Sequence, residues 1–338
     1  MATPAAGNIS GTITPNAYLT DYSVQYIADN RNYVAGAAAS LIPVELQAAE
    51  YTVYDRGAFL RDEMEYRPLG GRPPQVGYSV SDDNYFAKEY SLEHPIDDRQ
   101  RRKFPANRQI NLDLNGTRLL TNKSLIKRDV TWAQKFFRPG VWSFDVTGVA
   151  SAPEAGEFLQ FDQDGSDPIG TVDSYIDITG KATGFRPNTL VLGTNVRKNL
   201  RTNADLSDRI KYTRIGIADE DLLQSIFFGN DPTGRVMTAR SVYNAAAEGL
   251  PNDFRYIVDE NSMWMGYIDR NVGVDSPTAI GIFAWSGLIP GAGNDQGGVI
   301  MKGREELAHS DILQIRDAWD MKVVASDLGV FFQNVVSG

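Results

Sequence analysis

The chain has 338 residues, 42% of them hydrophobic, and its 33 basic and 43 acidic residues give a net charge of −10 at neutral pH. This composition predicts a globular protein with a sizeable core, and the negative charge argues against a dedicated nucleic-acid-binding protein. The absence of cysteine excludes disulfides, thiolate metal sites and cysteine nucleophiles. No apolar run approaches the roughly 20 residues of a membrane span, and no signal peptide is evident, so we expect a soluble, non-exported protein.

The first part of the chain, residues 1–49, is poor in charge and has no sustained hydrophobic period. It is predicted to be an extended arm, with at most a short helix at residues 43–46. An arm of this composition is normally disordered when nothing holds it. We therefore expect it to be held by another surface, most simply a neighbouring subunit.

Residues 50–98 have the pattern of a long two-stranded ribbon. Residues 51–54 are good strand formers, and in residues 86–92 the larger side chains occupy every second position, as on one face of a strand. Residues 67–74 between these runs are rich in glycine and proline and mark the tip. A lone two-stranded ribbon is marginally stable in water. An arm of this length should therefore lie on another surface.

A long amphipathic helix is predicted over residues 111–137 and should end at Pro139-Gly140. Gly116 should weaken or interrupt its first turns by roughly 1 kcal/mol relative to alanine. The predicted apolar stripe recurs at spacings of three, four and seven and comprises Leu112, Leu119, Ile126, Val130, Ala133 and Phe137.

Charge is distributed unevenly between these two segments. Residues 99–138 hold eleven basic and two acidic residues, a net charge of +9, whereas residues 50–98 hold five basic and eleven acidic residues, a net charge of −6. Opposite charge on adjacent segments allows pairing within one chain or between copies. The basic helix is either a solvated face or a contact for another chain or for packaged nucleic acid.

The second half alternates strands and helices. A strand at 190–192, Gly193 and a helix capped by Thr194 form one βα unit, whose basic residues Arg197, Lys198 and Arg201 should face water. We expect helices at 168–179 and 219–228, and strands at 141–146, 157–161, 235–241, 262–268 and 278–285. Residues 319–332 are strand-like and too apolar to be left exposed, so they should pack onto an earlier element.

None of the candidate chemical motifs is complete. The βα unit has one glycine where a dinucleotide site needs three, and residues 229–235 lack the lysine of a phosphate loop. The loop at 162–173 has calcium-ligand spacing but Asp167 where glycine is required, so a capped turn is the better interpretation. We therefore predict no catalytic, cofactor-binding or metal-binding residue. A carboxylate-dependent hydrolase remains the enzyme alternative, because 43 acids are available.

Several stretches, in order, resemble the major capsid proteins of tailed bacteriophages, which have the Hong Kong 97-like fold. The resemblance rests on residues 161–168, 186–193, 208–213, 277–279, 285–288 and 320–329. The N-terminal half matches by the order of its elements. The resemblance implies an α+β fold with an N-terminal arm (1–49), an extended loop (50–98), a spine helix and P-domain (99–185), an A-domain (186–310) and a C-terminal strand returning to the P-domain (311–338).

The function implied by the resemblance is structural: copies would tile an icosahedral shell around double-stranded DNA, with no enzymatic activity. Implied partners are hexamers and pentamers of the chain, scaffolding or decoration proteins, and DNA bound without sequence specificity; the location would be the virion, after assembly in the host cytoplasm. A nanocompartment shell of the same fold is the alternative. Lys88 could crosslink to a neighbour, but we predict that it does not. Candidate subunit-interface residues are Glu63, Glu65, Arg67, Arg72, Arg101, Arg102 and Lys103.

Overall fold

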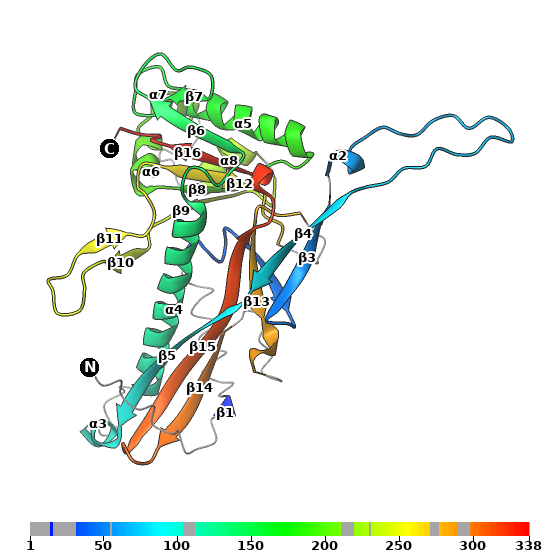
Figure 1. Ribbon diagram of the computed structural model, residues 1–338. Coiled ribbons are helices and arrows are strands. Elements are labelled where there is room, and N and C mark those ends of the chain that lie inside the picture. The colour runs from blue at the N-terminus through cyan, green and yellow to red at the C-terminus, as the bar shows by residue number, and fades with distance from the viewer. Residues whose placement is uncertain are drawn as a thin grey trace.

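The computed structural model describes residues 14–15, 32–54, 56–103, 112–210, 220–229, 231–270, 277–289 and 298–337. Two β-sheets, one at each end of the body, are covered by helices, and two narrow ribbons project from it (Figure 1). The α+β fold class is therefore confirmed.

The elements follow the chain in this order. The helices are α2 (Arg56–Phe59), α3 (Asp98–Lys103), α4 (Leu112–Phe136), α5 (Pro168–Thr183), α6 (Thr194–Leu200), α7 (Ala204–Ile210) and α8 (Glu220–Phe228), with short 3-10 turns at Ser286–Leu288 and Ser326–Leu328. The strands are β1 (Thr14–Pro15), β2 (Ser40–Val44), β3 (Ala48–Tyr54), β4 (Val80–Phe86), β5 (Lys88–Asp97), β6 (Phe144–Val149), β7 (Glu157–Leu159), β8 (Thr189–Leu192), β9 (Arg235–Thr238), β10 (Val242–Asn244), β11 (Phe254–Tyr256), β12 (Met263–Gly266), β13 (Ile280–Trp285), β14 (Gly298–Glu305), β15 (Ser310–Val323) and β16 (Gly329–Gln333).

The first sheet has the order β7-β6-β16-β12-β8-β9, and α5, α6, α7 and α8 lie around it (Figure 1). Every residue of β8 and β12 is buried, which fits their continuous apolar sequences. The last strand, β16, pairs antiparallel with β12 and parallel with β6. The prediction that the C-terminal run packs back onto an earlier element is confirmed.

The predicted βα unit is present as β8 and α6, but its helix is capped differently. Gly193, not Thr194, is the N-cap residue, and the Thr194 hydroxyl donates to the Glu260 carboxylate at 3.0 Å. The Glu260 carbonyl accepts hydrogen bonds from the amides of Asn195 and Val196. These amides at the start of α6 are therefore not available to bind an anion. A side chain at Gly193 would collide with this carbonyl, and glycine is therefore required by packing.

The turn before α5 is capped as predicted. Asp167 is the N-cap residue, and its side chain accepts a hydrogen bond of 2.7 Å from the amide of Gly170. Pro168 occupies the first turn, where its missing amide costs nothing. The helix continues to Thr183, four residues beyond the predicted end, and stops at Gly184 in the left-handed conformation.

The second sheet has the order β1-β14-β15-β13-β2, with β5 also pairing with β15. Its long β14–β15 hairpin was mostly not predicted. Only the end of β15, from residue 319 onwards, lies in a segment that the sequence indicated as strand-like. The short helix that was at most expected at residues 43–46 does not form: β2 runs parallel to β13 from Ser40 to Val44, and no helix follows it there. An isolated four-residue helix nucleates poorly, whereas the strand gains a ladder of hydrogen bonds with β13.

The long helix α4 is confirmed at Leu112–Phe136, but its buried face is only partly the predicted one. Phe137, just after the helix, is buried, and Leu112 and Ala133 pack against the core. Leu119 of the predicted stripe is 45% exposed. The buried residues are Gly116, Thr117, Leu120, Thr121, Leu125, Asp129, Trp132 and Phe136. Three of these are polar, so hydrophobicity alone could not identify the face.

Gly116 does not interrupt α4; it lets the helix approach the sheet. A Cβ at this position would lie 2.8 Å from both Cδ2 of His94 and Cδ1 of Leu313. We expect Gly116→Ala to lower the free energy of unfolding by about 1–3 kcal/mol, since overpacking outweighs alanine's better helix propensity. Chemical denaturation would measure this. Gly180→Ala in α5, where the nearest atom is 3.5 Å away, is the matched control and should be neutral or stabilising; equal effects at both sites would contradict the packing argument.

Residues 32–39 are fastened to α4 by Asp129, which is 1% exposed. Its carboxylate accepts from the amide of Ala35 at 2.8 Å and from that of Val34 at 3.2 Å. Val34, Ala35 and Ala38 are themselves buried in the core beside Trp132. For residues 32–39 the holding surface is thus the same chain. The prediction for residues 1–31 lies outside the described residues, apart from Thr14–Pro15.

Candidate interaction surfaces

The most prominent surface is the outer part of the loop predicted over residues 50–98, and from here on the extended loop means this part, residues 56–79. Strands β3 and β4 form its stem, with Tyr54 opposite Val80, and the loop then leaves the body and points away from it (Figure 1). At its tip the Gly71 amide donates to the Pro68 carbonyl at 2.9 Å, and the Arg67 guanidinium donates to the Gly71 carbonyl at 2.5 Å. A two-stranded ribbon with a Gly/Pro tip is therefore present, but its second strand is β4 at Val80–Phe86. Most of the predicted second strand, residues 86–92, instead belongs to β5, which pairs with β15.

The extended loop exposes large apolar side chains. Met64 is 95% exposed and Tyr66 is 92% exposed, and Leu69 at the tip is fully exposed. Contiguous exposure of this kind is rare on monomeric proteins and marks an interaction site. The loop is thus built for contact with a second surface.

The root of the loop is held by aromatic rings. Tyr54 packs against Phe59 with ring centroids 6.0 Å apart, and Phe59 against Tyr78 at 5.3 Å. The stem in turn rests on β13, where Tyr85 stacks on Phe283 at 4.7 Å. These contacts fix the direction in which the loop leaves the body.

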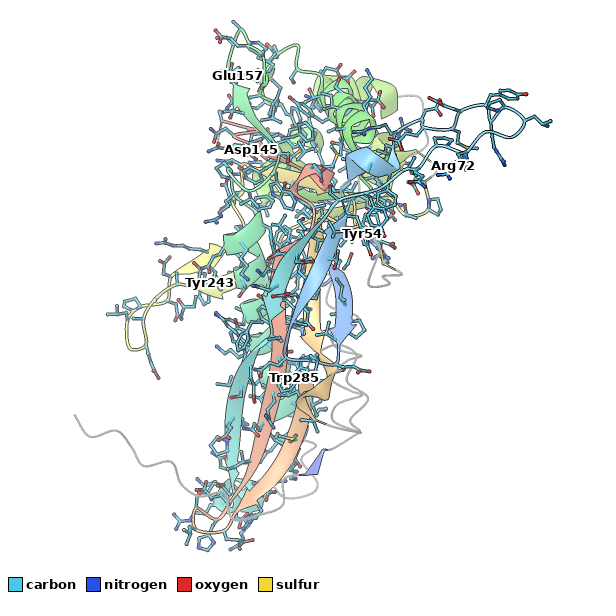
Figure 2. All side chains as sticks on the ribbon, turned by 45° about the vertical axis from the view of Figure 1, so that its right-hand side comes forward. Tyr54, Arg72, Asp145, Glu157, Tyr243 and Trp285 are labelled. Carbon is cyan, nitrogen blue, oxygen red and sulfur yellow. The ribbon has the colours of Figure 1, made fainter. Side chains whose placement is uncertain are left out.

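The candidate interface residues fall into two separate groups. Glu63, Glu65, Arg67 and Arg72 lie on the extended loop, and Figure 2 shows Arg72 far out along it, beyond Tyr54. The other three lie on α3, at the opposite end of the body (Figure 1). Within one chain the structure does not bring the two groups together.

At α3 the three basic candidates differ. Arg102 and Lys103 are exposed, whereas Arg101 forms ion pairs with Asp113 at 2.5 Å and Asp311 at 2.9 Å. Lys302 also binds both of these carboxylates. Burial would raise the pKa of Asp113, but its hydrogen bonds from Arg101 and Lys302 hold that pKa below its usual value.

Part of the basic charge of α4 is neutralised by β15. The Arg128 guanidinium lies 2.6 Å from the carboxylate of Asp317, which is 3% exposed, and Lys135 lies 3.1 Å from Asp320. The solvated-face interpretation is therefore wrong for Arg128, whereas Lys135 is paired but remains exposed. The sequence did not indicate this because the acids lie about 190 residues away in the chain.

A groove of about 470 Å³ runs between α4 and β5, and the sequence did not indicate it. Tyr90 lines it and stacks on Trp319 at 4.6 Å, with the ammonium of Lys127 5.4 Å from the Tyr90 ring centroid. The full lining is Glu89, Tyr90, Ser91, Leu92, Lys123, Ser124, Lys127, Ile315, Asp317 and Trp319.

The two acids of this groove give no support to the hydrolase alternative. Glu89 is paired with Arg316 at 2.5 Å, and Asp317 with Arg128. The hydrogen bond from Arg316 lowers the pKa of Glu89, which is the opposite of what a general acid at neutral pH needs. Within the described part of the chain, no three metal-ligating side chains gather, and no helix has the length and apolarity of a membrane span.

A second projection is the β10–β11 hairpin, which leaves the body on the side opposite the extended loop (Figure 1). Tyr243 lies on it in Figure 2. Its Phe254 is 68% exposed and Leu250, near its turn, is 64% exposed. Apolar contact surface is thus presented on two sides of the molecule.

Comparison with known proteins relates the chain to phage proteins. No protein-family model matches it. It is 25% identical over 224 residues, 65% of this chain and 68% of the relative, to the major capsid protein of Burkholderia phage BcepMu. The crystal structure of a phage-related protein from Bordetella bronchiseptica RB50 is similar with a TM-score of 0.71 and 16% identity, over 96% of this chain and 98% of that one. The capsid structure of cyanophage P-SCSP1u is similar with a TM-score of 0.53 and 8% identity, over 98% of this chain and 92% of that one.

Proposed function

We propose that this chain, whose fold is the Hong Kong 97-like fold of phage capsid proteins, is the structural protein from which a capsid shell is built. Its likeness to solved structures extends over nearly the whole of both chains. The observation that carries the proposal is the extended loop, whose Met64, Tyr66 and Leu69 are almost fully exposed. These side chains need a partner surface, and in a homo-oligomer that surface belongs to another copy.

The mechanism is repeated burial of surface. Each copy offers a long loop with exposed apolar side chains on one side and a hairpin with exposed apolar side chains on the other, so contacts can continue from copy to copy in a closed arrangement (Figure 1). Because every copy makes several contacts at once, each single contact can be weak. Catalysis has no place in this mechanism, and we infer that the protein is not an enzyme.

The organisation of the shell and the domains of the chain are part of the same proposal. The copies would form hexamers and pentamers around double-stranded DNA, assemble in the host cytoplasm and accept scaffolding or decoration proteins. The division into arm (1–49), two-stranded ribbon with its extended loop (50–98), spine helix and P-domain (99–185), A-domain (186–310) and returning strand (311–338) belongs to this proposal. In this proposal DNA is bound without sequence specificity, through contacts to phosphates alone.

Purified protein should assemble into closed shells of uniform diameter, visible by negative-stain microscopy and as a fast-sedimenting species. Assembly should depend on ionic strength, because charged residues surround the exposed apolar ones on the loop. Protein that stays monomeric at every salt and protein concentration would contradict the proposal.

A nanocompartment shell of the same fold is the second candidate, and the contents of the shells distinguish the two. Shells isolated from cells should contain double-stranded DNA if they are capsids. Shells that contain a single co-purifying protein and no nucleic acid would instead identify a nanocompartment.

A further inference from the structure

We propose that Asp129 couples residues 32–39 to the root of the β10–β11 hairpin, defined as residues 239–241 and 257–258, so that each segment is held more firmly while the other is in place. The coupling belongs to the single protomer and goes beyond the proposed shell function. Its basis is the arrangement of these segments around one buried carboxylate of α4.

The β10–β11 hairpin depends on its root for support. It has two strands of three residues each, and five of these six residues are exposed. A two-stranded hairpin of this kind is marginally stable when nothing else holds it. In its pairing register Val242 lies opposite Tyr256 and Asn244 opposite Phe254, so the exposed apolar side chains share one face. The order of that face is therefore set where the hairpin joins the body.

The root of the hairpin meets the carboxylates of two different helices. On the solvent side, the Arg240 guanidinium donates to the Glu220 carboxylate of α8 at 2.7 Å. On the core side lies Ser241, which is 3% exposed and whose carbonyl accepts from the Ile257 amide at 3.0 Å. The Ser241 hydroxyl has no hydrogen-bond partner of normal length among the described groups. It is thus a buried donor that gains free energy from any acceptor beside it.

Asp129 supplies that acceptor. A carboxylate has about four acceptor sites. The Val34 amide lies 3.2 Å from both oxygens of Asp129 and the Ala35 amide 2.8 Å from one, so these amides fill three of the sites. Burial raises the pKa of Asp129, and the donors of Ala35, Ser241 and Val34 oppose the rise. The remaining site is therefore available to the Ser241 hydroxyl, and one carboxylate serves both segments.

The two segments also share one apolar core beside α4. Val34 and Ala35 belong to the same buried cluster as Trp132 of α4. Ala239 and Val258, on the two sides of the hairpin root, are buried in this cluster as well, and Figure 1 shows the hairpin leaving the body beside α4. In a close-packed core one segment cannot shift without its neighbours. The docking of residues 32–39 thereby affects how firmly the exposed face of the hairpin is presented.

Hydrogen exchange of the full-length, unassembled protein tests the coupling. Ser241→Ala removes one hydroxyl from the hairpin root and should speed amide exchange about threefold or more in residues 242–256. Because a coupling free energy acts in both directions, the same variant should also speed exchange in residues 32–39. Exchange in β8 and β12 should stay unchanged, which shows that the effect is local.

Asp129→Ala approaches the same contact from the other side. It should speed exchange in residues 242–256, and adding Ser241→Ala should bring no further change there, because the hydroxyl has then already lost its acceptor. Ser225→Ala is the matched control. It removes an exposed hydroxyl that bonds the Asp221 carbonyl within α8, and it should leave both segments unchanged.

A Ser241→Ala protein in which only the hairpin exchanges faster, or in which neither segment does, would overturn the coupling. The measurement is made on the protomer, so it gives the same answer whether or not the protein forms shells. Failure of the unaltered protein to form shells would contradict the proposed function and leave the coupling untouched.

Discussion

Replacing the residues between Tyr54 and Val80 with the dipeptide Asn-Gly is expected to abolish shell assembly and leave a folded protomer. The pairing register places Tyr54 opposite Val80, so a two-residue turn can close the hairpin without disturbing β3 or β4. The stem keeps its contact with the body through Tyr85 and Phe283. The deletion removes the exposed apolar surface of the loop and, at its root, the contacts of Phe59 and Tyr78 with Tyr54. Sedimentation should show monomers at concentrations where the unaltered protein forms shells.

A control separates loop length from loop chemistry. Met64→Ser, Tyr66→Ser and Leu69→Ser together keep the length and remove apolar surface that is at least 92% exposed at each position. This variant should need an at least tenfold higher protein concentration to form shells, and its circular dichroism spectrum should be unchanged. Shells formed by the shortened protein would show that the extended loop is not an assembly element.

Asp129→Ala is expected to destabilise the protomer by about 2–5 kcal/mol, because two buried amides lose their acceptor. These are the amides of Val34 and Ala35, which Asp129 binds at 3.2 and 2.8 Å. Asp129→Asn keeps one acceptor oxygen and should cost less. Urea denaturation would measure both variants. Equal stability of the alanine variant and the original protein would show that Asp129 does not fasten residues 32–39.

Asp129 should also make the protein more stable as the pH falls, which is the opposite of the usual effect of a carboxyl group. Burial raises its pKa to about 6, although the bonds from the Ala35 and Val34 amides partly oppose this shift. The folded state then binds the proton more tightly than the unfolded state, whose carboxyl titrates near 4. The contribution of Asp129 to the free energy of unfolding therefore increases by on the order of 3 kcal/mol as the pH falls from about 7 to about 4.

The pH effect can be isolated by comparison with Asp129→Asn, because all other carboxyls are common to both proteins. Stability relative to this variant should rise as the pH is lowered from 8 to 5, measured by urea denaturation at each pH. A constant difference, or one that falls in acid, would contradict the raised pKa of Asp129.

Local sequence patterns were sufficient for much of the fold. The α+β class, the long helix, the βα unit around Leu190–Leu192, the Asp167 cap and the Gly/Pro tip of the ribbon all follow from residues near one another in the chain. Turn residues, caps and periodicity act over fewer than about ten residues, so sequence alone reports them. The ordered motifs of the second half also indicated the capsid fold.

Partners distant in sequence decided the rest. Which face of α4 is buried depends on Val34 and Ala35, which satisfy Asp129, and on His94 and Leu313, which require Gly116. Arg101 belonged to the predicted interface set, and only its position beside Asp113 and Asp311 reveals that its charge is already paired. Likewise, the groove exists only because α4 lies on β5 and β15. A buried polar group or a close backbone approach is favourable only when its partner is in place, and no local pattern contains that partner. The sequence alone therefore determined the kinds and order of the elements, and the tertiary structure decided which of their faces are free to meet another copy.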